Sequence, residues 1–188
     1  MLLFSSLKKY LPESNIYFNN IIHHTNNVVI NNSSPNYVLD LPSYITYYEN
    51  GQLEKEIWYK NGKFHRGGDL PADVYYNKNG QPSAQSWYKN GKLHREGDLP
   101  ALIFYYSNGQ PHLQYWYKNG RWHREGDLPA FIDYYHNGQP FIKSWRKNDE
   151  LYREGDLPAV IHYYRNGQLL KEIWYKNEKL YREKNHNI

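Results

Sequence analysis

Residues 87–101 read WYKNGKLHREGDLPA, and this stretch returns with few changes along most of the chain. Its Asp-Leu-Pro segment occurs five times at a constant spacing of 29 residues. Self-similarity at a fixed period is typical of repeat architectures, in which each repeat forms one supersecondary unit. The chain therefore divides into five tandem units, 40–68, 69–97, 98–126, 127–155 and 156–184.

Two Asn-Gly turns occur in each of the first three units, as at Asn50-Gly51 and Asn61-Gly62. Asn-Gly between aromatic and β-branched residues is a strong hairpin signal, because both residues tolerate positive φ in a type I′ turn. Each unit is predicted to run strand, turn, strand, turn, strand, and then a Gly-Asp-Leu-Pro loop in which Asp caps backbone amides. The predicted fold class is all-β: an elongated, solenoid-like stack of tandem β-hairpin repeats, built as one sheet or as a two-sheet stack.

Alternation along the first strand of each unit separates its side chains into two faces. In unit three, Ala101, Ile103 and Tyr105 share one face, and their columns are nearly constant from unit to unit, which predicts the packed face. The columns of the other face vary between units, and large apolar patches on such a face usually mark binding surfaces. The partner-binding residues predicted for this variable face are Leu102, Phe104, Tyr106, Phe131, Tyr135 and Tyr75.

Constant columns are predicted to be structural rather than catalytic, because five copies in identical settings do not resemble a single asymmetric active site. They comprise the tryptophans Trp58, Trp87, Trp116, Trp145 and Trp174, expected in the core, and the loop aspartates Asp69, Asp98, Asp127 and Asp156. His65, His94 and His123 lie one unit apart, so they are not expected to share a metal ion. The arginine after each is expected to pair with Glu96, Glu125 or the Asp of the next loop. No enzyme activity, cofactor or metal is predicted.

The two ends of the chain differ from the repeats. Residues 1–39 are predicted to form an N-terminal cap. Residues 10–39 are interpreted as a decayed unit; the alternative is a short helix near Ser5–Tyr10 followed by an Asn-rich loop. Units four and five replace the second turn glycine by Asp149 and Glu178 and are predicted to cap the other end. Residues 185–188 are expected to form a tail.

Composition narrows the functional classes. The chain has no cysteine, which excludes disulfides and thiolate metal sites, and its formal net charge of +4 permits contact with nucleic acid. The apolar start, Met1–Phe4, is too short for a signal peptide, and no apolar run approaches the length of a membrane helix. We therefore expect a cytoplasmic protein that is not secreted.

The phrases YYSNGQ at 105–110 and WYKNGR at 116–121 resemble the MORN-variant repeat. The fuller unit at 87–101 is similar to the multicopy repeat proteins of giant DNA viruses of amoebae. The resemblance covers 40–184 and implies a viral β-hairpin scaffold that binds partners, located in the host cytoplasm. MORN proteins sometimes bind lipids, but their repeats are shorter and lack the Gly-Asp-Leu-Pro loop, so lipid binding is not carried over.

Three functional hypotheses follow from the sequence. The leading one is a non-enzymatic scaffold that binds a protein partner, such as a host protein, through the variable aromatic face. Alanine at Phe104 and Phe131 is then expected to abolish partner capture without lowering the melting temperature. The alternatives are a nucleic-acid- or glycan-binding module that uses exposed aromatic and basic residues, and a self-assembling structural protein whose open ladder edges pair.

Overall fold

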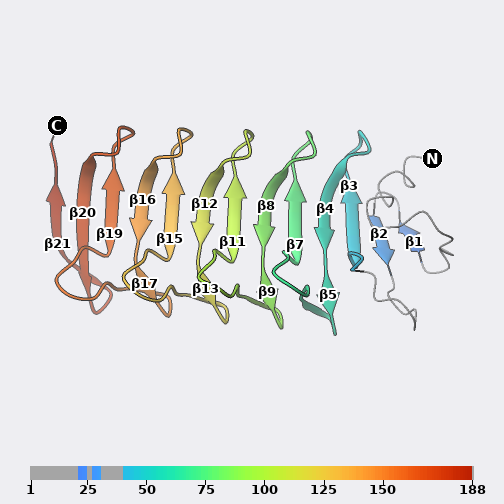
Figure 1. Ribbon diagram of the computed structural model, residues 1–188, viewed down its shortest axis with the longest axis horizontal. Coiled ribbons are helices and arrows are strands. Elements are labelled where there is room, and N and C mark those ends of the chain that lie inside the picture. The colour runs from blue at the N-terminus through green and yellow to red at the C-terminus, as the bar shows by residue number, and fades with distance from the viewer. Residues whose placement is uncertain (1–20, 25–26, 31–39, 188) are drawn as a thin grey trace.

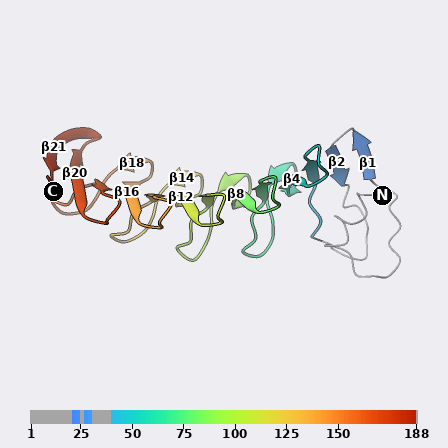
Figure 2. The same ribbon diagram turned by 90° about the horizontal axis from the view of Figure 1, so that it is seen from above.

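The computed structural model describes residues 21–24, 27–30 and 40–187 of the chain. Every regular element in these ranges is a β-strand, and thirteen of them form one antiparallel sheet of successive hairpins, which confirms the predicted all-β repeat stack. Figure 1 shows the strands side by side along the long axis, and Figure 2 shows that they form a single layer. Within the described part of the chain, no helix is long and apolar enough to cross a membrane.

The large sheet takes two strands from each of units one to four and three from unit five, and neighbouring units pair directly through them. Its strands, in spatial order, are β1 (Ile21–His24), β2 (Asn27–Ile30), β3 (Tyr44–Tyr47), β4 (Leu53–Ile57), β7 (Asp73–Tyr76), β8 (Pro82–Ser86), β11 (Leu102–Tyr105), β12 (Pro111–Tyr115), β15 (Phe131–Tyr134), β16 (Pro140–Ser144), β19 (Val160–Tyr163), β20 (Leu169–Lys176) and β21 (Lys179–Asn185).

The third strand predicted for each unit does not enter the large sheet in units one to four. After Trp58 the chain forms a separate two-stranded hairpin, because the place beside β4 belongs to β7 of the next unit, with Ile57 opposite Asp73. These small hairpins lie along the lower edge of the sheet in Figure 1. They are β5 (Tyr59–Lys60) with β6 (Lys63–Phe64), β9 (Tyr88–Lys89) with β10 (Lys92–Leu93), β13 (Tyr117–Lys118) with β14 (Arg121–Trp122), and β17 (Arg146–Lys147) with β18 (Glu150–Leu151).

The two Asn-Gly turns of a unit have different geometry. In the second turn both Asn61 and Gly62 have positive φ, 52° and 69°, as the type I′ prediction requires. In the first turn only Gly51 does, and the Asn50 side chain accepts the backbone N–H of Gln52 at 3.1 Å. The type I′ prediction is therefore wrong for the first turn. There the Asx-type hydrogen bond holds Asn50 at negative φ, and only Gly51 adopts the left-handed conformation.

The core is a ladder at the joints between units. Trp58 is buried against Ala72 and Val74 of the next unit, and Trp116 is buried in the same way against Ala130 and Ile132. The other three tryptophans of this column, Trp87, Trp145 and Trp174, are 6–7% exposed. Each unit thus buries its tryptophan mainly on its neighbour, so isolated units lack a complete core.

Only the last unit departs from the pattern at the C-terminal side. β20 continues through Trp174, and β21 folds back along it, so that Glu183 lies opposite Ile173 as Asp73 lies opposite Ile57. Unit four retains its small hairpin although Asp149 has replaced glycine, at φ 80°. The predicted cap at units four and five is therefore confined to unit five. His186, placed in the predicted tail, contacts Glu172 at 2.8 Å.

At the other end, the hairpin of β1 and β2 joins the sheet through pairing of β2 with β3. The helix considered near Ser5–Tyr10 and most of the predicted decayed unit lie outside the described residues.

Candidate interaction surfaces

A clamp of three side chains repeats on the constant side of every unit. In unit three, the Arg124 guanidinium lies 4.0 Å from the Trp116 ring centroid and donates to both carboxylate oxygens of Asp98 at 2.8 and 2.9 Å. It also donates to the carbonyl of Pro129 in the following loop at 3.1 Å. The clamp therefore joins the beginning and end of one unit to the start of the next.

The clamp corrects two expectations. The arginine pairs with the aspartate that opens its own unit, 26 residues earlier, rather than with Glu96, Glu125 or the next aspartate. The loop aspartates accept from guanidinium groups instead of capping amides, and these hydrogen bonds lower the carboxyl pKa of Asp69 and Asp127 below the ordinary value. The equivalent pairs are Asp40–Arg66, Asp69–Arg95, Asp98–Arg124, Asp127–Arg153 and Asp156–Arg182.

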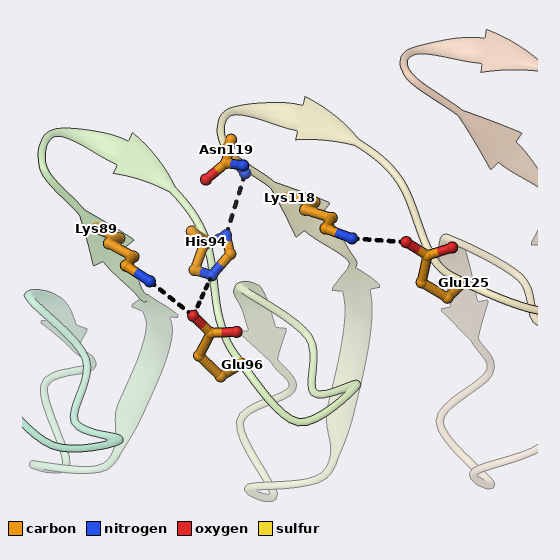
Figure 3. A network of polar contacts seen from close by, with 6 residues as sticks. All are labelled: Lys89, His94, Glu96, Lys118, Asn119 and Glu125. Carbon is orange, nitrogen blue, oxygen red and sulfur yellow. Dashed lines mark hydrogen bonds and ion pairs between the residues drawn. The ribbon is translucent and has the colours of Figure 1, made fainter.

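One member of the histidine column, His94, forms a polar link between units (Figure 3). The backbone N–H of Asn119, in unit three, donates to Nδ1 of buried His94 in unit two at 3.1 Å. Nε2 of His94 lies 3.0 Å from the Glu96 carboxylate, which also accepts from Lys89 at 2.8 Å. These two donors lower the Glu96 pKa to about 2. Within the described residues, no group of three or more side chains is arranged to hold a metal ion.

The loop leucines have an exposure that the sequence did not indicate. The leucine after each loop aspartate is invariant, and in unit one Leu41 is half-buried, yet in units two to five the leucines are 42–47% exposed; they are Leu70, Leu99, Leu128 and Leu157. Leu70, Leu99 and Leu128 line shallow pockets between neighbouring loops, and the pocket that Leu70 and Leu99 line has a volume of about 540 Å³. Burial in a core therefore does not explain the invariance of this column.

The variable face carries an aromatic cluster in its centre. Tyr115 lies 4.9 Å from Phe131, 5.5 Å from Trp122 and 6.2 Å from Phe104, measured between ring centroids. Trp122 stacks parallel to Phe131, and Tyr117 meets Trp122 edge-on. We call Phe104, Tyr115, Tyr117, Trp122 and Phe131 the aromatic cluster.

The predicted partner-binding residues fall into separate groups. Leu102 is half-buried beside the cluster, since it lies opposite Tyr115 across β11 and β12, and Phe104 is 37% exposed. Tyr106 lies towards the turn, stacked between the rings of His112 and His136, with its hydroxyl donating to the Tyr134 carbonyl.

Tyr135 and Tyr75 also lie apart from the cluster. Tyr135 packs on Phe141, with ring centroids 5.0 Å apart, and Tyr75 is 40% exposed beside Lys55, whose Nζ donates to its hydroxyl. Phe131 is half-buried in the cluster, so alanine there would remove packing. We therefore expect alanine to lower the melting temperature more at Phe131 than at the more exposed Phe104, and the unchanged melting temperature stays a prediction for both.

Tyr115, Tyr117 and Trp122 were missed because only first-strand columns were compared. The column of Tyr115 reads Ile, Ser, Tyr, Ser, Ile, and that of Trp122 reads Phe, Leu, Trp, Leu, Leu. The same variability test applied to the second strand and the small hairpin would have found both positions.

Two carboxylates flank the cluster on this face. Asp73 is buried with Lys55 3.6 Å away, and Asp133 is half-buried with His112 at 3.6 Å. Burial raises the pKa of both carboxyl groups above the ordinary aspartate value. Holding these charges on the face therefore costs folding free energy, which is frequent at functional sites.

No family model, curated protein or solved structure matches this chain. The fold itself defines it as a tandem β-hairpin repeat protein with a single-layer sheet. The resemblance to MORN-variant repeats and to giant-virus proteins remains a prediction.

Proposed function

We propose that this protein is a non-enzymatic scaffold that binds a protein partner through its variable face. The aromatic cluster carries the proposal, because the strands form a single layer (Figure 2) and Phe104 on the variable face is 37% exposed. Binding energy at protein interfaces concentrates in a few aromatic side chains that lie in a tightly packed centre. Phe104 is the most exposed member of the cluster and the expected anchor.

The polar groups beside the cluster provide orientation. Lys55 with Asp73 lies on the side of the N-terminal units, and His112 with Asp133 lies near the centre. Charged groups around an apolar centre contribute specificity and association rate more than affinity. A partner segment with apolar side chains in its middle and flanking charges fits this arrangement.

The test replaces Phe104 by Asp, which places a charge on the exposed part of the cluster with little loss of packing. Immobilised full-length chain is exposed to an amoebal lysate, and a protein retained by the wild type is purified and titrated by calorimetry. We expect Phe104→Asp to weaken its binding at least ~30-fold, the effect of losing an anchor residue. Wild-type binding should show a negative heat-capacity change from apolar burial.

The matched control is Tyr152→Asp, which changes an aromatic residue of similar exposure, 45%. Tyr152 belongs to the column that holds histidine in units one to three and tyrosine in units four and five. It should bind like the wild type, and both variants should melt within a few degrees of it. Equal binding by Phe104→Asp and the wild type would exclude the variable face as the docking surface.

A further inference from the structure

The small hairpins form a row beside the strand ends of the large sheet, and backbone hydrogen bonds join each hairpin to the next. The N–H of Gly91 donates to the carbonyl of Phe64 in the preceding hairpin at 3.0 Å, and Gly120 N–H donates to Leu93 at 2.8 Å. Asp149 N–H donates to the Trp122 carbonyl at 2.9 Å. Since each unit adds two strands to the large sheet, successive hairpin tips are about 9.6 Å apart. The backbone thus places the tips at a regular spacing.

In units one to three the tips carry like charges directly opposite each other. The cross-strand partners are Lys60 with Lys63, Lys89 with Lys92, and Lys118 with Arg121, and all six residues are exposed. We call these six residues the basic ridge. Like charges directly opposite each other destabilise a strand pair, so folding alone does not favour this arrangement. In unit four Lys147 lies opposite Glu150, which ends the ridge; in unit five Lys176 again lies opposite Lys179, but that turn joins two strands of the large sheet and is not one of the small hairpins.

Four of the six cations have no carboxylate partner among the described residues. Lys89 and Lys118 are paired with Glu96 and Glu125, at 2.8 and 2.6 Å (Figure 3). In unit one the position of these glutamates is occupied by Gly67. The unpaired cations are Lys60, Lys63, Lys92 and Arg121.

The lysine stems are packed rather than free. A Cβ at Gly91 would lie 3.3 Å from Cβ of Lys63, and one at Gly120 would lie 3.4 Å from Cβ of Lys92. Each stem therefore lies against the turn of the next hairpin, in space that only glycine leaves open. This contact reduces the conformational entropy that the cation loses on binding an anion.

Aromatic rings follow the same hairpins. Tyr59 is 41% exposed and lies 4.8 Å from Phe64, which stacks on Tyr88 of the next hairpin at 4.7 Å. Because Tyr59 and Lys60 are consecutive, the rings and the cations project from opposite faces of each hairpin. A single strand that wraps around the hairpin tips would place phosphates on the cations and bases on the rings, the two contacts by which proteins bind single-stranded nucleic acid.

We propose that the basic ridge of units one to three binds single-stranded nucleic acid. A single strand is favoured over a double helix because the exposed ring of Tyr59 on the same hairpins can stack only on bases that are not already stacked within a duplex. The ridge and the aromatic cluster share the hairpin of β13 and β14, in which Lys118 and Arg121 alternate with Tyr117 and Trp122, but the ridge proposal does not depend on the function proposed for the cluster.

The test measures fluorescence anisotropy of labelled oligouridine and oligothymidine of about twelve nucleotides with the full-length chain. We expect the logarithm of the association constant to fall linearly with the logarithm of the salt concentration. Four unpaired cations give a slope of roughly −3, because each phosphate contact contributes about −0.7. Lys63→Gln with Lys92→Gln should reduce the slope by about 1.4 and weaken binding roughly tenfold at about 50 mM salt.

The chain offers a matched control and a gain of function. Lys176→Gln with Lys179→Gln removes the same two charges from the turn of unit five, beyond the end of the ridge, and should leave binding unchanged. Glu150→Lys extends the ridge into unit four and should steepen the slope by about 0.7. Melting temperatures confirm that all variants fold.

Three outcomes would overturn the proposal: no binding of either oligonucleotide at low salt, equal losses in the ridge and control variants, or binding of heparin with none of the oligonucleotides. The second would reduce the effect to net charge, and the third would assign the ridge to anionic glycans.

Discussion

At the scale of the residue, the Trp–Arg–Asp clamp explains most of the invariant columns. Arg124 combines ring stacking, a two-pronged bond to Asp98 and a bond to the Pro129 carbonyl, although its side chain is only 14% exposed. The planar guanidinium makes these three contacts at once, which an ammonium group cannot do. The five repeated arginines are therefore accounted for by geometry as well as charge.

We expect Arg124→Lys to lose most of what Arg124→Ala loses, about 1–2 kcal/mol of unfolding free energy, from the combined stacking and surface ion pair. Arg182→Ala should lose less, because its side chain is 42% exposed. Chemical denaturation of the three variants measures these differences. Full stability of Arg124→Lys would show that charge alone matters.

At the scale of the element, the small hairpins depend on glycine for two different reasons. Gly62 and Gly91 both have positive φ, 69° and 80°. Nothing lies within 4 Å of a Cβ at Gly62, whereas a Cβ at Gly91 would meet the Lys63 stem. One turn needs glycine for conformation only, and the other also needs it for contact with the preceding hairpin.

Gly62→Ala should therefore cost about 1 kcal/mol from left-handed backbone strain. Gly91→Ala should cost roughly twice as much, because the hairpins must also separate and weaken the bond from Gly91 N–H to Phe64. Thermal unfolding of the two variants provides the comparison. Equal losses would mean that the hairpin row is not packed as described.

At the scale of the whole molecule, the charges make stability depend on pH. The carboxyl pKa is lowered for five residues by arginine, lysine, histidine or tyrosine donors: Asp69, Glu96, Glu125, Asp127 and Asp156. It is raised by burial for Asp73 and Asp133. The first group binds protons more weakly in the folded chain than in the unfolded chain, and the second binds them more strongly.

Stability should therefore fall as the pH decreases below about 4.5, because the first group of carboxyl groups is larger than the second. The contribution of the first group to stability is fully present above the pKa values of the unfolded chain, and it is lost as the pH falls through the lowered pKa values of the folded chain. Melting temperatures between about pH 6 and pH 2 test this. Arg153→Gln removes the donor that lowers the Asp127 pKa, so its acid-induced loss should be smaller. A melting temperature that rises on acidification would mean that Asp73 and Asp133 dominate.

The sequence alone determined the unit and its two faces. The 29-residue period, the second Asn-Gly turn and the alternation of Ala101, Ile103 and Tyr105 depend on local geometry, which the order of residues specifies directly. The same alternation placed Phe104 on the face of the sheet that does not carry the constant columns.

Only the tertiary structure decided how the units meet. Direct pairing of β4 with β7 leaves the third strand outside the sheet, and thus creates both the row of small hairpins and the basic ridge. The partner of each arginine and the grouping of Tyr115 and Trp122 with Phe131 were decided there too. These are contacts between residues distant in the chain, and no local preference distinguishes among the partners that the repeat offers in five similar copies.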